Sequence, residues 1–293
     1  MTPRTRMFEI ECGGHRLTFG EKTLVMGILN ITPDSFSDGG RFFSLESAVE
    51  HAKAMAEAGA DILDVGGEST RPYSDSIPQE EELRRVVPVI QAIAGRISIP
   101  ISIDTTKARV ALEAIRAGAS IVNDISALRS DPEMADVVAG QGVPLILMHM
   151  KGTPKDMQMA PVYHDLMGDL TNFFQRAIQH AEERGIPGSK IIIDPGIGFG
   201  KTFAQNLCIL KNLRLLETLR APIMVGTSRK AFIRHLLQDA EGQAPAPDQS
   251  IVENGTQATI AAAVLNGAHI VRCHDVSMAR TTLKIIDAIK TAA

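Results

Sequence analysis

Arg272 and His274 stand two residues apart in the segment RCHD, which follows a short apolar run near the end of the chain. On an extended strand, residues at this spacing share one face. A guanidinium and an imidazole placed side by side can bind an anion such as a phosphate group. The alternative is a surface ion pair with the neighbouring Asp275.

The segment GTSRK (226–230) is a second candidate anion site, because it lies between an apolar run and an amphipathic one. Backbone amides at a helix start attract negative charge, and the side chains of Ser228 and Lys230 add donors. The alternative is that Ser228 only caps the helix while Arg229 and Lys230 are solvated.

Asp104, Asn123 and Asp194 indicate a different kind of ligand, because they stand at the ends of short apolar runs. A flat heterocycle with amine and lactam edges needs carboxylate acceptors and an amide facing it. A buried carboxylate is costly without such partners. The alternative is that the two aspartates cap loops. A metal cluster is disfavoured, since the sequence contains no HxxH or HExxH spacing.

Eight short apolar segments alternate with amphipathic ones, and these are the elements that must position the polar residues. They cover residues 24–29, 61–65, 101–104, 120–124, 144–148, 190–194, 222–226 and 269–272. Short continuous apolar runs are typical of strands buried on both faces. The segments between them read as helices, as at 44–60, which begins with a serine and ends near a glycine. The pattern predicts an α/β fold, a closed (β/α)8 TIM barrel. An open doubly wound sheet is the alternative.

The rest of the chain adds little to this plan. Residues 8–19 read as a short N-terminal β-hairpin turning at two glycines. No segment divides the chain, and 239–249 reads as an exposed loop. We therefore expect one domain over 1–293, with the barrel at 24–291.

Polar or glycine-rich segments follow all eight predicted strands, which is the end where active sites of such barrels lie. Asn30 follows the first strand and Met148 ends the fifth. Phe199 lies in the glycine-rich loop after the sixth, where it can pack on a ligand ring or on the core. The sequence therefore predicts a single site at one mouth of the barrel.

Composition gives no support for several classes of partner. The net charge of −4 does not favour binding to nucleic acid or to a membrane surface. The chain has 3 cysteines and no CxxC motif, which indicates a reducing compartment and predicts a cytoplasmic protein. No secretory signal or apolar run long enough to span a membrane is recognisable.

The assembled motifs resemble those of bacterial dihydropteroate synthases over residues 26–276. The matching segments are MGILNITPDSFSDGGRF (26–42), DVGGESTRP (64–72), SIDTTK (102–107), VNDI (122–125), LMHMKGTP (147–154), DPGIGFGK (194–201), GTSRK (226–230) and RCHDV (272–276). The first two are the most specific in combination. Tyr73 departs from the pattern, because many family members carry glycine after STRP.

The resemblance implies an enzyme of folate biosynthesis, a homodimer, that joins 6-hydroxymethyl-7,8-dihydropterin diphosphate to p-aminobenzoate with the help of Mg²⁺. It implies pterin binding by Asp104, Asn123, Met148, Asp194, Phe199 and Lys230. It implies diphosphate binding by Asn30, Arg272 and His274, with Asn30 also at the metal. It implies p-aminobenzoate binding by Thr70, Arg71 and Ser228. The residues implied in catalysis are Asp104, Asp194, Lys230, Arg272 and His274.

The implied reaction is SN1-like: diphosphate leaves first, the dihydropterin supports the cation, and the arylamine then attacks. No enzyme nucleophile is required. Loops 31–43 and 67–78 are expected to close over the site and exclude water.

Three other functions fit parts of the pattern. A pterin-binding barrel that transfers a methyl group from methyltetrahydrofolate would share the acid and amide contacts but not the Arg272 and His274 pair. A Schiff-base aldolase would need Lys230 on a strand rather than at a helix start. A pterin-binding subunit without turnover would not need the full set of groups.

Overall fold

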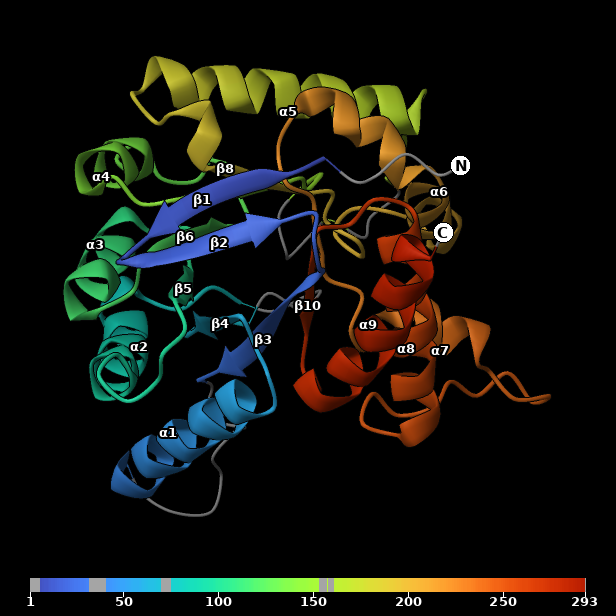
Figure 1. Cartoon of the computed structure of the whole chain (residues 1–293), viewed down its shortest axis with the longest axis horizontal. Helices are drawn as coiled ribbons and strands as arrows, with labels where there is room; N and C mark the ends of the chain where they lie inside the picture. Colours follow the sequence, from blue (N-terminus) through green and yellow to red (C-terminus); the bar gives the residue numbers. More distant parts are fainter. Residues whose placement is uncertain (1–5, 32–40, 70–74, 153–156, 158–160, 293) are drawn as a thin grey trace.

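The computed structural model describes residues 6–31, 41–69, 75–152, 157 and 161–292. The described elements form a barrel of parallel strands with helices around it, and a small hairpin lies across one end (Figure 1). No helix within the described ranges is long and apolar enough to cross a membrane.

Eight parallel strands make the barrel. They are β3 (Leu24–Asn30), β4 (Ile62–Gly66), β5 (Ile101–Asp104), β6 (Ile121–Asp124), β7 (Leu145–Met148), β8 (Ile191–Asp194), β9 (Met224–Val225) and β10 (Ile270–Cys273). Apart from β8 and β9, each strand pairs with the next in sequence, and β10 pairs with β3. A bridge between Ile193 and Ile223 joins β8 to the residue before β9 and closes the ring. The prediction of a closed barrel is confirmed, and the open sheet is excluded.

Helices cover the outside of the barrel. They are α1 (Arg41–Glu57), α2 (Gln79–Ile93), α3 (Ala108–Ala117), α4 (Met134–Gln141), α5 (Leu166–Glu183), α6 (Phe203–Asn212), α7 (Ala231–Leu236), α8 (Ser250–Leu265) and α9 (Val276–Thr291). Two short 3₁₀ segments span Gly188–Lys190 and Leu213–Leu219. The amphipathic pattern of residues 203–219 predicts one helix, but the structure ends α6 at Asn212 and tightens residues 213–219 into the second 3₁₀ segment.

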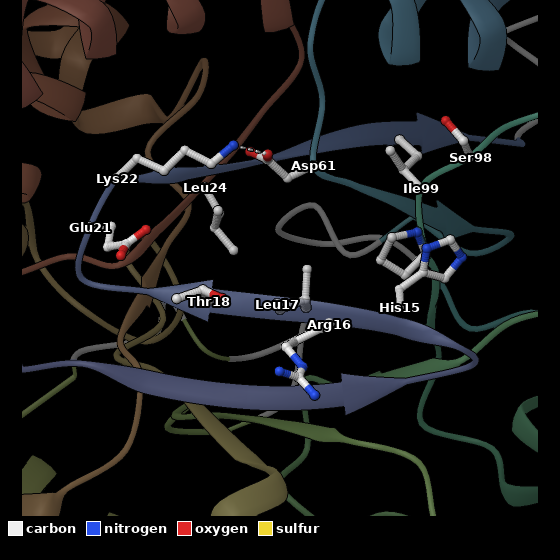
Figure 2. A pocket seen from close by; sticks show the side chains of 11 residues that line it. His15, Arg16, Leu17, Thr18, Glu21, Lys22, Leu24, Asp61, Ser98 and Ile99 are labelled. Atoms are coloured by element: carbon white, nitrogen blue, oxygen red, sulfur yellow. Dashed lines mark hydrogen bonds and ion pairs between the residues drawn. The ribbon is translucent and has the colours of Figure 1, made fainter.

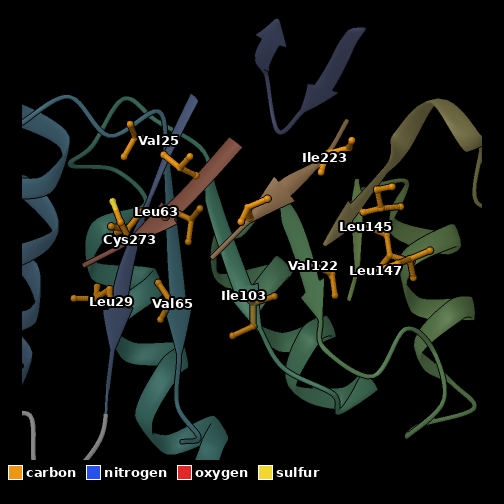
Figure 3. Close-up of a cluster of buried hydrophobic side chains, with 14 of the residues drawn as sticks. Val25, Leu29, Leu63, Val65, Ile103, Val122, Leu145, Leu147, Ile223 and Cys273 are labelled. Atoms are coloured by element: carbon orange, nitrogen blue, oxygen red, sulfur yellow. The ribbon is translucent and has the colours of Figure 1, made fainter. Parts of the chain in front are cut away.

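Alternate residues of each strand face opposite sides of the barrel wall. One set, which includes Val25, Leu63, Ile103 and Val122, packs outward with the helices (Figure 3). The other set faces the interior and includes Met26, Ile62, Ile121, Ile146, Ile192, Met224 and Ile270. Because the side-chain period of a strand is two, the next inward residue is two positions further along. That position lies nearer the carboxyl end, as with Asn123, Asp194 and Arg272.

The hairpin, formed by β1 (Phe8–Cys12) and β2 (His15–Phe19), closes the amino end of the barrel. Ile10, Leu17 and Phe19 belong to the same apolar cluster as the inward-facing strand residues. The predicted hairpin is therefore confirmed. A hollow beside it is lined by residues such as Lys22 and Asp61, which precede the strands (Figure 2). It thus lies at the end opposite the carboxyl ends of the strands.

The hairpin plug should be important for stability. Phe19 is fully buried at the base of the barrel, with 0% of its surface exposed. Phe19→Ala should lower the free energy of unfolding by about 3–5 kcal/mol, because it leaves a cavity. Met7→Ala, at a side chain that is 51% exposed, should change it by less than about 0.5 kcal/mol. Urea denaturation measures both, and equal values for the two variants would contradict this account of the plug.

Candidate active site

The polar inward-facing residues gather at the carboxyl mouth of the barrel. Strand pairing places Gly66 beside both Asn30 and Asp104, and Asp104 beside Asn123. Met148 pairs in the same way with Asp194. The strand period therefore brings together side chains that are far apart in the sequence.

Arg272 connects two acids across this mouth. Its Nε donates to Asp64 Oδ2 at 2.6 Å, and its Nη2 donates to Asp104 Oδ2 at 2.8 Å. Asn123 Nδ2 donates to the same oxygen of Asp64 at 3.0 Å. Asp275 instead caps α9, since its carboxylate accepts from the amide of Met278. The surface ion pair weighed for Arg272 is therefore not what the structure shows.

Asp64 is a site residue that the sequence reasoning missed. It is fully buried in β4, where an acid interrupts an apolar strand. An acid within an apolar strand could have identified Asp64 from the sequence, since a buried charge needs a partner. Among the described residues, Asp64 Oδ1 and Asn123 Oδ1 have no hydrogen-bond partner. Buried acceptors of this kind are suited to receive donors from a ligand.

Asp104 carries a shifted pKa. Burial raises the pKa of Asp104 to about 7, against the opposing effect of Arg272. For Arg272 the balance is reversed: burial alone would lower the pKa, but Asp64 and Asp104 raise it. The guanidinium therefore stays charged, and Asp104 titrates near neutrality.

Asp194 ends β8 beside a second cation. Its Oδ1 accepts from the amide of Gly196 at 2.7 Å, so the loop-capping alternative describes part of its role. Burial raises the pKa of Asp194, while the Gly196 amide and Lys230 oppose this. Burial and the nearby Arg272 lower the pKa of Lys230 to about 8. Asp194 and Asp104 thus lie at the same mouth as the cations Lys230 and Arg272.

Phe199 and Lys230 form one wall of the site. The Nζ of Lys230 lies 4.0 Å from the centroid of the Phe199 ring, within cation–π range. Phe199 belongs to a small apolar cluster with Ile125, Met148, Met150 and Met157. Phe199 therefore packs on its apolar neighbours and borders the polar mouth, and its contact with a ligand ring stays a prediction.

Ser228 and His274 meet at the edge of the mouth. Ser228 Oγ lies 2.9 Å from His274 Nδ1, and the amide of His274 donates to the same hydroxyl at 3.3 Å. Ser228 does not cap α7, whose N-cap is Lys230. Arg229 between them has a left-handed φ of +58°, rare for a residue with a side chain. This turn sends Ser228 toward His274 and Lys230 toward Phe199.

Several predicted site elements cannot be placed in this arrangement. Thr70, Arg71 and Tyr73 lie outside the described residues, as do most of loop 31–43 and the centre of loop 67–78. The start of the second loop is anchored: Lys107 contacts Glu68, and Arg85 donates to the carbonyl of Gly67 at 2.9 Å. Within the described ranges, no group of three or more His, Cys, Asp or Glu side chains could hold a metal.

Removing Asp64 tests its role in holding the site. Asp64→Ala leaves Arg272 and Asn123 without a buried acceptor, so the free energy of unfolding should fall by about 3 kcal/mol. Glu50→Gln is the control, because its ion pair with Lys53 is exposed and is worth less than about 1 kcal/mol. Chemical denaturation measures the free energy of unfolding of both variants. An unchanged value for Asp64→Ala would contradict the role of Asp64 in holding Arg272 and Asn123.

Comparison with known proteins agrees with this geometry. A family model for pterin-binding enzymes matches residues 26–274. The dihydropteroate synthase of Synechocystis is 46% identical over 92% of this chain and 91% of its own length. The solved structure of the Xanthomonas albilineans enzyme with 4-aminobenzoic acid aligns with a TM-score of 0.89 and 41% identity, covering 98% of this chain and 100% of that one.

A second structure of the Xanthomonas albilineans enzyme, in complex with 7,8-dihydropteroate, aligns with a TM-score of 0.86 and 39% identity. It covers 97% of this chain and 100% of the other. The chain therefore belongs to the pterin-binding enzymes and, among them, to the dihydropteroate synthases.

Proposed function

We propose that the chain condenses 6-hydroxymethyl-7,8-dihydropterin diphosphate with p-aminobenzoate to give 7,8-dihydropteroate and diphosphate. The observation that carries this proposal is the meeting of Asp104 and Asp194 with Arg272 and Lys230 at one mouth of the barrel. A heterocycle with donor edges and an anionic leaving group need these two kinds of partner in one place. Relatives that were solved with 4-aminobenzoic acid and with 7,8-dihydropteroate support it.

The pterin ring is proposed to lie between Met148 and Phe199, with its polar edges toward Asp104, Asn123 and Asp194. The two carboxylates accept N–H donors of the ring, and the unpaired amide oxygen of Asn123 accepts another. The two apolar side chains belong to one buried cluster, which suits the faces of a flat ring. Lys230, above Phe199, borders the same ring.

The diphosphate is proposed to bind Arg272, His274 and Asn30. The Asn30 amide oxygen borders the bare backbone of Gly66, because a Cβ there would lie 3.8 Å from both Asn30 Oδ1 and Asp104 Oδ2. Mg²⁺ typically binds one or two protein oxygens together with substrate phosphates. Asn30 fits that donor set, and the metal would supply positive charge to the diphosphate.

The p-aminobenzoate is proposed to place its carboxylate at Ser228, with Thr70 and Arg71 from the loop after β4. Ser228 is only 6% exposed, and it is held by His274 at the edge of the mouth. The helix behind it, α7, begins three residues later and is short. Side-chain and loop donors are therefore expected to contribute more than the helix dipole.

The proposed chemistry needs no nucleophile from the protein. The bond between the pterin methylene carbon and the diphosphate oxygen breaks, and the electron pair leaves with the diphosphate. Arg272 and His274 stabilise this charge, while the aspartates favour the cation left on the pterin. The arylamine nitrogen then forms the new C–N bond and releases a proton. Closure of loops 31–43 and 67–78 excludes water, which would otherwise capture the cation.

The other functions considered from the sequence are less well supported. The methyltransferase alternative is not favoured, because the relatives compared are dihydropteroate synthases. A Schiff-base aldolase is disfavoured, because Lys230 begins a helix and packs over Phe199. A homodimer and a cytoplasmic location stay predictions from the sequence.

A turnover assay tests the proposed reaction. The chain is incubated with the pterin diphosphate, p-aminobenzoate and Mg²⁺, and dihydropteroate and released diphosphate are measured. Equimolar formation of the two products is expected. Pterin binding without turnover would instead favour a non-catalytic subunit.

The pocket assignment predicts a specific loss for Asp194→Asn. The change removes a charged acceptor, so affinity for 6-hydroxymethyl-7,8-dihydropterin should fall about 10- to 100-fold. Asp248→Asn, in the exposed loop before α8, is the matched control. Calorimetry that gives equal affinity for wild type and Asp194→Asn would remove this residue from the pocket.

The leaving-group assignment predicts losses for Arg272→Ala and His274→Ala. Each should lower kcat/KM for the pterin diphosphate about 100-fold, because a donor to the developing charge is lost. Binding of the pterin alcohol, which has no diphosphate, should change much less in His274→Ala. Unchanged kinetics in either variant would exclude that residue from the mechanism.

A further inference from the structure

Lys201 is a buried lysine that none of the roles above uses. It follows the glycine-rich segment after β8, and only 1% of its surface is exposed. Lysine is almost never fully buried unless it is paired, because its ammonium group loses hydration. A buried lysine beside a binding site therefore requires an explanation.

The contacts of Lys201 join two neighbouring loops. Its Nζ lies 2.9 Å from His149 Nδ1 and donates to the carbonyls of His149 at 3.2 Å and Phe199 at 2.9 Å. An ammonium group has three N–H donors, and these three acceptors match that number. His149 follows β7 and Phe199 follows β8, so one side chain links the two strand ends.

The two loops are also in close backbone contact. A Cβ at Gly196 would lie 2.0 Å from the carbonyl oxygen of His149, and one at Gly200 would lie 2.4 Å from that of Lys151. Both glycines have positive φ values, which favour glycine. The loop after β8 can approach the loop after β7 this closely only with glycine at positions 196 and 200. Lys201 adds hydrogen bonds to the same contact between the two loops.

The fastened loops carry the proposed walls of the pterin pocket. Met148 directly precedes His149, and the carbonyl that Lys201 holds belongs to Phe199 itself. The ring of His149 is supported from behind by Phe173, with 4.7 Å between the ring centroids. A shift of Lys201 would therefore move both apolar walls.

Lys201 also acts electrostatically on Asp194. A positive charge on Lys201 lowers the pKa of Asp194, as Lys230 and Arg272 do more strongly. Burial lowers the pKa of Lys201 to about 7, Lys230 acts in the same direction, and Asp194 opposes them. His149 carries no charge near neutral pH, because burial and Lys201 lower its pKa to about 2. The charge of Lys201 is therefore present mainly below neutral pH, where Asp194 most needs support.

We propose that Lys201 is a positioning residue for the pterin end of the site. It holds the loops after β7 and β8 so that Met148 and Phe199 form the two apolar walls, and it places a positive charge behind Asp194. This inference rests on the proposed pterin pocket.

The test compares Lys201→Met with wild type. KM for the pterin diphosphate should rise at least tenfold, while KM for p-aminobenzoate changes less than twofold, because Ser228 lies on another loop. As the pH is lowered, the variant should also lose affinity for 6-hydroxymethyl-7,8-dihydropterin at a higher pH than the wild type does. Without Lys201, Asp194 becomes protonated at a higher pH and loses its capacity as an acceptor.

Two further variants separate positioning from general stability. Thr23→Val removes a partly buried hydrogen bond, 2.8 Å long, from Thr23 Oγ1 to Asp287 at the opposite end of the barrel. It should lower Tm without changing either KM or the pH profile. Lys201→Gln keeps N–H donors but lacks the charge. It should therefore lose pterin affinity at a higher pH than the wild type on acidification, and this can be measured even if Lys201→Met does not fold.

The outcomes distinguish this inference from the proposed function. Absence of pterin binding by the wild type would overturn the pterin pocket itself. The positioning role alone would be overturned if the wild type binds the pterin and the Lys201 variants keep both its KM for the pterin diphosphate and its pH dependence of pterin affinity. An equal rise of both KM values would also overturn it, since that indicates general loosening.

Discussion

The carboxyl mouth of the barrel depends on the guanidinium of Arg272, which is held between two buried acids. Each ion removed from water costs several kcal/mol, so a group such as Asp64 is tolerated only with a partner. Arg272 contacts Asp64 and Asp104, which lie 208 and 168 residues away in the sequence. One side chain on β10 thereby ties together the carboxyl ends of three strands.

This pairing can form only because the barrel interior changes character along its axis. Most of the first inward residues of the strands are apolar and share a cluster with the hairpin, whereas the next inward positions include Asp64, Asn123, Asp194 and Arg272. The plug of Phe19 and its neighbours keeps water from the amino end. The buried acids Asp64, Asp104 and Asp194 accordingly lie toward the carboxyl end, beyond this apolar layer.

Much of the fold could be predicted from the sequence, because strands buried on both faces leave continuous apolar runs. All eight barrel strands lie within one or two residues of the predicted ones. The end of α6 at Asn212 could not be predicted, since residues 213–219 keep an apolar pattern compatible with either helix type.

The candidate site was harder to predict where a residue acts through its neighbours. Arg272 and Asp104 lie at or next to strand ends and were identified there. Asp64 lies in the middle of β4, within an apolar run. Lys201 follows a glycine loop, and lysines in that position are usually solvated. Sequence alone does not reveal that its Nζ is turned inward to His149.

On the proposed function, the arrangement around Arg272 also explains why more than one positive group is needed at the diphosphate. Arginine has five N–H donors, and two of its nitrogens already serve Asp64 and Asp104. The guanidinium is thus fixed in place and still has donors for a phosphate. The same acids offset most of its positive charge, however. Stabilising a departing diphosphate therefore requires further groups, and this is the role in which His274, as a hydrogen-bond donor, and a divalent metal at Asn30 are proposed.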